Sequence, residues 1–390
     1  MVTGLGSIVG TGAFVAIGIA AGRWGDTLFL AIPLAAVVAV FNGMSSAFLA
    51  GRYPVAGGTY EYGYQTLNQW LGFSAGWLFL LAKTASAATA ALGVTLYLGV
   101  EGPVIPIAAV AVVTAMVIGG IRRTAWLNMI LVLASGGAIV WFATSAVLTR
   151  DGLSDIAIEF SGADLAAAIA FLFVAYTGYG RIATLGEEVH DPEITIPRAV
   201  VITLVAAAGL YMAVEIGGRA HAGASWGVEA GIVETGGLVV VLGAIAAMLG
   251  VLLNLILGLS RVWLAMGRRG DMPSRLARLN DRSQPIAAIA LSAGLVAALT
   301  LIGDIGLAWS FSAMTVLLYY GLTNLAALAI ERTRATAWLG LASCIFLSFF
   351  VPPGIWVAGV SLVAAGLVWK TVYTNVAKRG VRAPRRTYED

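Results

Sequence analysis

Two glycine-interrupted stretches carry the residues of this sequence that are best suited to bind a small charged molecule. They are residues 4–14, which read GLGSIVGTGAF, and residues 171–180, which read FLFVAYTGYG. Each has Gly-Xaa-Gly near the middle of a long apolar segment. A helix broken inside lipid frees backbone N–H and C=O groups that cost several kcal/mol each, so a break persists where these groups line a cavity or bind something.

The freed groups at the two interruptions have opposite character. The N–H groups and the positive dipole end of a half-helix that begins near Thr11 and Gly12 suit a carboxylate. The carbonyl groups that end the preceding half-helices suit an ammonium group. They lie around Ser7, Ile8, Val174 and Thr177. We therefore expect a site for a zwitterion such as the backbone of an amino acid, although Gly6 and Gly10 could instead only allow close helix packing.

Three ionisable residues inside apolar segments are candidates for a functional role, because a charge at mid-bilayer costs roughly 2.5 to 3.5 kcal/mol on insertion scales. They are Lys83, Arg181 and Glu215. Lys83 could sense protons or replace a bound cation, or its side chain only snorkels. Arg181 could pair with helix-end carbonyls or with Glu187 and Glu188. Glu215 is either a proton carrier or a partner for Lys83 or Arg181.

The elements that must position these residues are apolar helices. Of the 390 residues 59% are hydrophobic and 11% are charged, with a mean hydropathy of +0.91. This composition excludes a disordered chain, a nucleic-acid partner and an ordinary cytosolic enzyme. It predicts a polytopic membrane protein whose 48 glycines favour close helix packing. The lone Cys344 excludes an intramolecular disulfide.

Long apolar runs separated by charges, prolines and polar clusters predict twelve transmembrane helices. The expected spans are 1–21, 27–50, 70–99, 103–120, 124–149, 163–186, 198–222, 236–267, 285–303, 305–330, 336–351 and 354–371. Alternating strands typical of an outer-membrane barrel do not occur in the sequence, so we expect an all-α fold. The first span lacks the basic start of a signal peptide. Its short lead into the membrane suggests that an N-terminal cytoplasmic extension is missing.

Lysine and arginine orient the predicted helices, because basic loops are retained on the cytoplasmic side. With both termini inside, the cytoplasmic loops and the tail hold 18 of the 23 basic residues. The opposite side holds three, which are Arg23, Arg150 and Arg219. We expect an inner or plasma membrane protein with both termini in the cytoplasm.

Several motifs together resemble the amino acid–polyamine–organocation (APC) superfamily of amino acid permeases. The run at 6–12, GSIVGTG, is similar to its first-helix motif. Residues 176–179 with 183–192 and 196–199 are similar to its sixth helix and following loop. Residues 260–262 with 265–273 are similar to the end of its eighth helix. The motifs follow the expected order across nearly the whole chain.

This resemblance implies a five-plus-five inverted repeat in which helices 1 and 6 are broken. The first repeat would cover 1–150 and the second 151–331, with peripheral helices at 332–371 and a basic tail at 372–390. It also implies alternating access around a central amino acid site, with Tyr176 as an aromatic gate. In the third helix Ser86 shares one face with the small residues Ala82, Thr89 and Gly93. This face either leaves room for a substrate side chain, with Ser86 as a polar contact, or only allows tight helix packing. The residues expected to bind substrate are Ser7, Ile8, Gly10, Thr11, Gly12, Ser86, Val174, Ala175, Tyr176, Thr177 and Gly178.

Two departures from the family pattern leave the coupling mechanism open. Relatives often carry an acidic residue after the sixth-helix glycine, where this chain has Gly180 and Arg181. Proton-coupled relatives carry a lysine in the fifth helix, at the position of Ser135. No cofactor is expected beyond a coupling H⁺ or Na⁺. Proton symport, sodium symport and exchange remain alternatives, as does polyamine transport, and the oligomeric state is not predicted.

Two other classes of protein remain as rivals. Residues 72–76 match Gly-x-Ser-x-Gly, the motif of a serine hydrolase, but that elbow needs a strand, a turn and a nearby base. A channel would favour a polar face along a whole span, whereas these spans are apolar apart from the two interruptions. The loop at 187–192 contains possible metal ligands, but a solvated loop is the favoured interpretation, so no metal site is expected.

Overall fold

The structure, a computed structural model, describes residues 6, 8, 10–53, 57–149, 161–183, 191–222 and 232–381. Every regular element in these residues is a helix. The first half forms η1 (Gly12–Ala16), α2 (Ile17–Trp24), η2 (Gly25–Thr27), α3 (Leu28–Arg52), α4 (Thr59–Thr66), α5 (Gln69–Leu98), α6 (Val104–Ile118) and α7 (Ile121–Thr149). The second half forms α8 (Gly162–Tyr176), η3 (Thr177–Tyr179), α9 (Gly180–Ala183), α10 (Pro192–Ala222), α11 (Ile232–Arg269), η5 (Ser274–Ala277), α12 (Ile286–Thr300), α13 (Ile305–Ala327), η6 (Glu331–Thr333), α14 (Arg334–Ser348) and α15 (Pro353–Val381).

Local sequence signals set several helix ends. The Asn68 side chain accepts hydrogen bonds from the backbone N–H groups of Trp70 and Leu71, both at 2.9 Å, and so begins α5. Gly99 ends α5 in the left-handed region, with φ at +63°. Ser161 and Asp304 cap α8 and α13 in the same manner as Asn68. These caps satisfy backbone groups that the helix itself leaves open.

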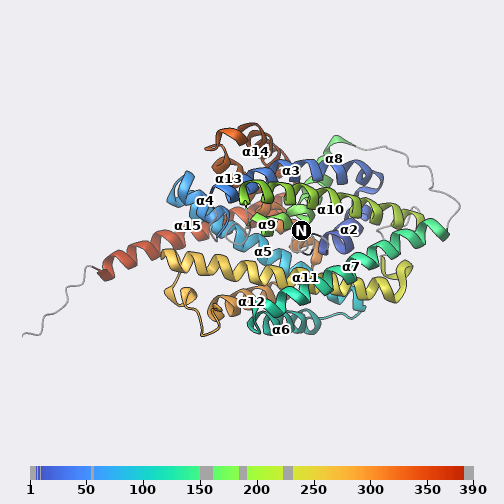
Figure 1. Cartoon of the computed structure of the whole chain (residues 1–390), viewed down its shortest axis with the longest axis horizontal. Coiled ribbons are helices and arrows are strands. Elements are labelled where there is room, and N and C mark those ends of the chain that lie inside the picture. The colour runs from blue at the N-terminus through green and yellow to red at the C-terminus, as the bar shows by residue number, and fades with distance from the viewer. Residues whose placement is uncertain are drawn as a thin grey trace, which may run out of the picture.

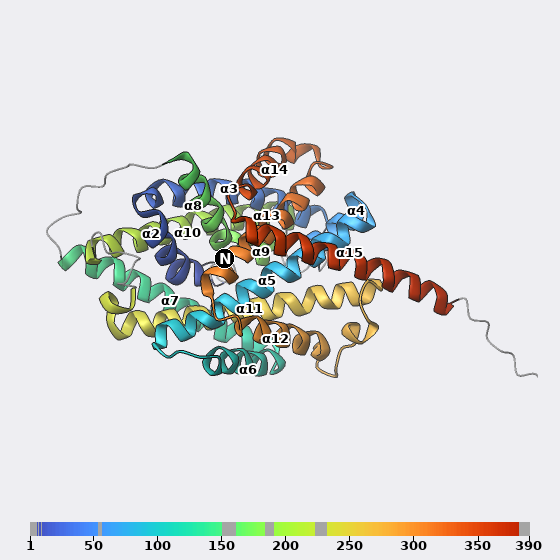
Figure 2. The same cartoon turned by 180° about the vertical axis from the view of Figure 1, so that it is seen from behind.

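Helix α5 runs through the middle of the bundle, where it packs against α11 and α13 (Figures 1 and 2). Helix α10 packs along α3, and α7 packs along α11. In both views α14 lies at one edge of the bundle, α6 and α12 lie at the opposite edge, and α15 projects from the body. Ile8, near the start of the described chain, is 1% exposed, so this part of the first segment is buried in the bundle.

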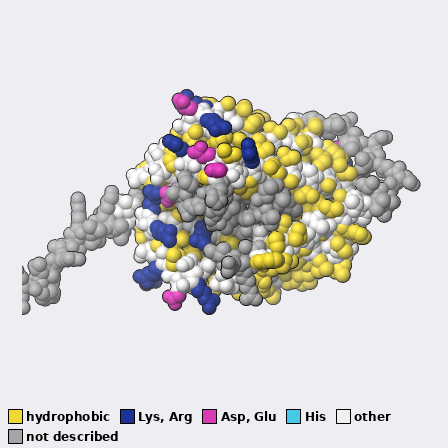
Figure 3. Space-filling view, viewed as in Figure 1, with side chains coloured by type: hydrophobic (Ala, Val, Ile, Leu, Met, Phe, Trp, Pro, Cys, Tyr) yellow, Lys and Arg dark blue, Asp and Glu magenta, His cyan; other side chains and the backbone are white. Residues whose placement is uncertain are grey.

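The helices and their outer surface fit a lipid environment. Eight helical segments of the described part are long and apolar enough to cross a membrane, and Val104–Ile118 and Ile286–Thr300 are apolar but shorter. Large apolar side chains such as Val104, Leu238 and Phe349 are more than 70% exposed. Charged side chains gather toward the end from which α15 projects, while the rest of this face is mostly apolar (Figure 3). This pattern is typical of a protein that contacts lipid around its middle.

Pairs of asparagines connect helices inside the bundle. The Asn324 amide donates to the Asn42 side-chain oxygen at 2.7 Å, joining α13 to α3. The Asn254 amide donates to the Asn128 side-chain oxygen at 2.6 Å, joining α11 to α7. Such side-chain hydrogen bonds stabilise helix pairs where apolar contacts alone give little preference over lipid.

Helix α4 is an element that the sequence analysis does not predict. It follows Gly58, which has φ at +57°, and lies against the start of α5. A Cβ atom at Gly72 would lie 2.5 Å from the Tyr64 ring, and one at Gly76 would lie 2.6 Å from the Tyr60 ring. The glycines of the Gly-x-Ser-x-Gly match therefore allow α4 to pack on α5. Because Ser74 lies within a continuous helix, this match is not a strand-to-helix elbow.

Candidate functional site

The first interruption lies around Gly10. This residue forms a turn whose N–H donates to the Ile8 carbonyl at 2.9 Å, and a wide π-helical segment follows over Gly12–Ala16. A Cβ atom at Gly10 would lie 2.2 Å from Cγ2 of Val251 in α11. Close contact with α11 therefore favours glycine here. Ser7 lies outside the described residues.

The second interruption is tighter than the unwound stretch that the sequence predicts. Helix α8 ends at Tyr176, a 3-10 turn spans Thr177–Tyr179, and α9 continues from Gly180. The Thr177 hydroxyl donates to the Val174 carbonyl at 2.8 Å. Side-chain donors thus satisfy carbonyls that the change of helix type would otherwise leave open.

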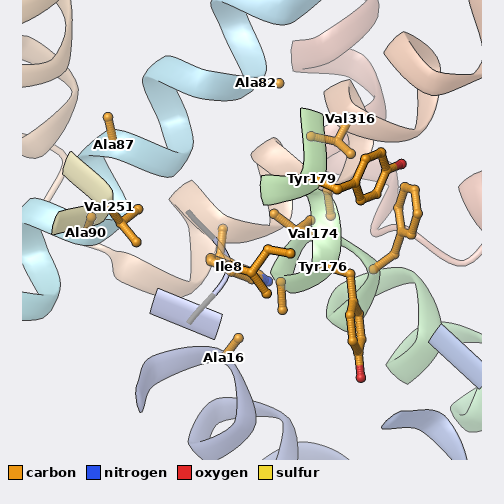
Figure 4. Packing of buried hydrophobic residues seen from close by; sticks show 14 of the residues in the cluster. Ile8, Ala16, Ala82, Ala87, Ala90, Val174, Tyr176, Tyr179, Val251 and Val316 are labelled. Carbon is orange, nitrogen blue, oxygen red and sulfur yellow. The ribbon is translucent and has the colours of Figure 1, made fainter. Parts of the chain in front are cut away.

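The Tyr211 hydroxyl brings the two interruptions together. It lies 2.8 Å from the Ile8 carbonyl oxygen and 2.8 Å from the Ala175 carbonyl oxygen. Since a phenol has a single hydrogen, it can donate fully to one of these carbonyls at a time. Ile8 and Val174 are both labelled in this region in Figure 4, and both are buried. Tyr211 was not among the residues expected at the site, because a tyrosine in an apolar helix has no local signal that separates it from a core residue.

Gly12 and Thr11 lie at the N-terminal end of the π-helical segment. A Cβ atom at Gly12 would lie 2.3 Å from the Tyr211 hydroxyl oxygen and 2.9 Å from the Ala175 Cβ. Thr11 is 3% exposed, and its hydroxyl has no hydrogen-bond partner within the described part of the chain. A buried hydroxyl without a partner is uncommon, so it marks a place where a ligand oxygen or ammonium would be stabilised.

Tyr176 is packed inside the bundle in this conformation, and its expected role as a gate stays a prediction. Its side chain is fully buried, and its hydroxyl donates to the Ile32 carbonyl of α3 at 3.0 Å. Its ring meets the Tyr211 ring edge-on, with the ring centroids 5.0 Å apart. In this conformation Tyr176 therefore packs α8 against α3 and α10, because its hydroxyl finds a backbone acceptor there.

Lys83 reaches the second interruption from α5. Its Nζ donates to the Thr177 hydroxyl oxygen at 3.1 Å, and the residue is 8% exposed. Ser86, one turn further along α5, has its hydroxyl 2.7 Å from the Ser312 hydroxyl of α13. In this conformation Ser86 joins α5 to α13, and its expected polar contact with a substrate stays a prediction.

Glu215 forms a different ion pair from those that the sequence suggests. The sequence offers Lys83 or Arg181 as its partner, whereas the structure places Arg219 Nε 2.6 Å from the Glu215 carboxylate. Arg219 also contacts Asp26 at the start of the turn before α3. The i,i+4 spacing of Glu215 and Arg219 on α10 explains the pairing. The Arg181 side chain and the loop at 184–190 lie outside what the structure describes.

Aromatic side chains close the bundle beside the C-terminal half of α8. The Trp309 indole N–H of α13 donates to the Phe171 carbonyl at 2.9 Å. The Phe171 ring lies 5.4 Å from the Trp24 ring and 6.0 Å from the Trp309 ring, measured between centroids. These contacts hold α2, α8 and α13 together on one side of the interruptions.

A polar cluster forms where α4, α5, α11 and α15 meet, and we call Tyr60, Tyr64, Asp271 and Lys370 the Asp271 cluster. The Tyr60 and Tyr64 hydroxyls donate to the Asp271 carboxylate at 2.8 and 2.6 Å. Lys370 Nζ donates to the Tyr64 hydroxyl at 2.7 Å and to Asp271 at 3.4 Å. Burial, together with the Asp271 charge, raises the pKa of both tyrosines, so they remain protonated donors.

The described residues contain no group of three or more His, Cys, Asp or Glu side chains placed to hold a metal ion. Their candidate chemistry at the interruptions is therefore that of backbone groups, hydroxyls and one ammonium group.

Comparisons with known proteins give consistent results. The family model described as "Amino acid permease" matches residues 1–382. The uncharacterized transporter Rv1999c of Mycobacterium tuberculosis is 37% identical, over 97% of this chain and 91% of that protein. The branched-chain amino acid permease BcaP of Bacillus subtilis is 26% identical, over 72% of this chain and 68% of that protein. The mitochondrial cationic amino acid transporter 3 of Arabidopsis thaliana is 25% identical, over 76% of this chain and 55% of that protein.

Proposed function

The chain belongs to the amino acid permease family of the APC superfamily, and from this premise we propose that it carries an amino acid across the membrane by alternating access. The family and the named relatives are permeases and transporters, so the chain is an amino acid transporter and not an enzyme. The observation that carries the proposed mechanism is the meeting of two interrupted helices at the Tyr211 hydroxyl.

The proposed architecture is the twelve-helix, five-plus-five inverted repeat. It places the first repeat at 1–150, the second at 151–331, the peripheral helices at 332–371 and the cytoplasmic tail at 372–390. The interruptions fall in the first and sixth of the expected spans, which is the correspondence that such a repeat requires. We further propose that the protein lies in the inner or plasma membrane with both termini in the cytoplasm.

In the proposed site the substrate carboxylate meets the free end of the π-helical segment at Thr11 and Gly12. Its ammonium group meets the carbonyls of Ile8 and Ala175. These two carbonyls lie near each other, because the Tyr211 hydroxyl contacts both. The unpartnered Thr11 hydroxyl supports this arrangement. Ser7, Gly10, Val174, Thr177 and Gly178 complete the proposed site. Tyr176 and Ser86 would join it only after a conformational change, since both are bonded to other helices.

Alternating access requires that the bundle closes on one side of the site at a time. The contacts of Trp309, Phe171 and Trp24 support closure at one end in this conformation. Opening would separate α8 from α13 and break the Trp309 hydrogen bond. The coupling ion is proposed to be H⁺ or Na⁺, with Lys83, Arg181 and Glu215 as candidate coupling residues.

Transport by the purified protein in liposomes tests this function. Vesicles are loaded with one unlabelled amino acid, and entry of the same labelled amino acid is followed for each of the 20 in turn. With a carrier, the rate of entry saturates as the external concentration rises. The labelled amino acid also accumulates transiently inside above its external concentration, because unlabelled substrate leaving the vesicle brings the binding site back to the outer face. Protein-free vesicles are the control. Entry that does not saturate would indicate a channel, and the absence of entry for all 20 would contradict the proposal.

A further inference from the structure

Lys83 is a buried ammonium group with an incomplete set of partners. It lies at the middle of α5 (Gln69–Leu98), and its one hydrogen bond in the described part of the chain is to the Thr177 hydroxyl at 3.1 Å. Thr177 donates its own hydrogen to the Val174 carbonyl, so its oxygen acts as an acceptor for Lys83. An ammonium group has three donors, and two of them thus have no acceptor among the described residues.

Lys370 shows what a satisfied buried lysine looks like in the same protein. Its Nζ donates to the Tyr64 hydroxyl and the Gln69 carbonyl, both at 2.7 Å, and to the Asp271 carboxylate at 3.4 Å. All three donors have acceptors, and one acceptor carries the opposite charge. Lys83 therefore differs from Lys370 in both hydrogen bonding and charge compensation.

No carboxylate of the described residues forms an ion pair with Lys83. The buried Glu215 is paired with Arg219, and Glu61 is paired with Arg269. A buried charge without a partner is costly, and removing one partner of a buried pair is among the more destabilising changes in a protein. Such a group persists where something else supplies the missing negative charge.

The position of Lys83 indicates that this missing partner is the substrate. Thr177 is the first residue of the 3-10 turn, and the carbonyl of Ala175, two residues earlier, shares the Tyr211 hydroxyl with Ile8. Tyr211 approaches the interruptions from α10, whereas Lys83 approaches from α5. A substrate whose ammonium group is held by the Ile8 and Ala175 carbonyls could extend its side chain toward Lys83.

We propose that Lys83 determines substrate charge: the transported amino acid presents a side-chain carboxylate to the Lys83 ammonium group, and cationic amino acids and polyamines are rejected. This inference rests on the proposed function, because it names the substrate class of the same site. Like charges in a site shielded from water repel one another strongly, which explains the rejection of cations.

Competition for binding tests the proposal on the purified full-length protein. The probes are glutamate and aspartate, their amides glutamine and asparagine, and leucine, lysine, arginine and putrescine, each measured by thermal shift and by inhibition of uptake. Each acid and its amide are nearly identical in shape and differ in charge. We expect an acid to bind about tenfold more tightly than its amide, since a hydrogen bond between charged groups supplies that difference. Lysine, arginine and putrescine should not compete.

Variants separate the role of Lys83 in charge recognition from a structural role. Lys83→Gln keeps a donor near Thr177 but removes the charge, so the preference for acid over amide should disappear. Lys83→Arg keeps the charge and should retain the preference. Arg268→Gln removes an exposed positive charge at the end of α11 and should leave the preference unchanged.

Two results would overturn the proposal. One is wild-type protein that binds lysine or arginine as tightly as glutamate and aspartate. The other is a Lys83→Gln variant in which the ratio of acid to amide affinity is unchanged. This result includes an equal loss of affinity for all amino acids, which would show that Lys83 binds the α-carboxylate instead of the side chain. If Lys83→Gln does not fold, the affinities of the wild-type protein for the acidic, neutral and cationic probes decide whether the proposal holds. Failure of the proposed function itself is distinct, because then no amino acid would bind or be transported.

Discussion

The Tyr211 hydroxyl contacts backbone carbonyls of both interrupted segments, and its removal should affect transport more than folding. We expect Tyr211→Phe to lower the uptake rate by about tenfold, since the loss of a buried donor costs about 1–3 kcal/mol at the carbonyls that it served. Uptake by reconstituted vesicles, divided by the amount of folded protein, measures this effect.

Tyr97→Phe is the matched control for this variant. Tyr97 is also buried, and its hydroxyl also donates to a backbone carbonyl, that of Phe14. It contacts one segment only, so its loss should lower thermal stability with a smaller effect on uptake. Equal losses of uptake in the two variants would argue that Tyr211 is an ordinary buried tyrosine.

A second prediction at the residue scale concerns the contact between Gly12 and Tyr211. A Cβ atom at Gly12 would lie 2.3 Å from the Tyr211 hydroxyl oxygen, so Gly12→Ala should force the two interruptions apart and abolish uptake while the protein still inserts. Tyr211→Phe removes the nearest of the atoms in the way, while the ring Cζ at position 211 and the Ala175 Cβ, both at 2.9 Å, remain. The double variant should therefore be more stable than the sum of the single effects predicts, by about 0.5–3 kcal/mol.

Gly18→Ala is the control for this cycle, because a Cβ atom at Gly18 would meet nothing within 4 Å. It should have little effect on stability or uptake. Thermal unfolding of the four proteins of the cycle measures the coupling. Strictly additive effects would show that the Gly12 contact with the Tyr211 hydroxyl is not what limits substitution there.

At the scale of elements, the Asp271 cluster fixes α4 to the ends of α11 and α15. Asp271→Asn removes the negative charge and one of the two carboxylate oxygens, of which Oδ2 accepts from Tyr60 and Tyr64 and Oδ1 accepts from Lys370. We expect a loss of about 1–3 kcal/mol in the free energy of unfolding, because the partner donors stay buried. Thermal unfolding in detergent measures it.

Glu331→Gln provides the comparison for the Asp271 variant. Glu331 is a largely exposed carboxylate with a 3.7 Å contact to Arg334, and such surface pairs contribute about 0–1 kcal/mol. Its replacement should change stability little. If the two variants unfold at the same temperature, the Asp271 cluster would not be a stabilising contact for α4.

Elements of high hydropathy were the part of the fold that the sequence could predict. Most described helices end within a few residues of their expected limits, because lipid requires long apolar helices whatever their partners, although α15 runs to Val381 instead of 371. The motif glycines likewise located both interruptions. Helix α4 was missed because it is short and polar, and because its hydrogen bonds to Asp271 join residues that are distant in sequence. The partners of Tyr176, Ser86 and Glu215 were missed for the same reason, since they depend on which helices meet.

At the scale of the whole molecule, closure beside α8 should depend on the Trp309 hydrogen bond. Cys344 is the only cysteine and is buried, so a Cys344→Ala background can carry a single reporter. Phe171→Cys keeps the backbone carbonyl that accepts from Trp309. Adding Trp309→Phe removes the donor but keeps an aromatic ring, and modification of the reporter by a polar maleimide should become about tenfold faster.

Trp338→Phe is the control for this whole-molecule prediction. Trp338 is 60% exposed on the outer surface of the bundle, so its replacement should leave the modification rate of the reporter unchanged. A rate that is the same with and without Trp309 would show that the aromatic contacts do not limit access from this end.

An experimental structure of the protein with its bound amino acid tests the central claim most directly. We predict density between the first and sixth helical segments, with the α-carboxylate within hydrogen-bond distance of Thr11 and Gly12 and the ammonium group facing the carbonyls of Ile8 and Ala175. Density for the substrate elsewhere in the bundle, with the first and sixth segments forming uninterrupted helices, would contradict the account.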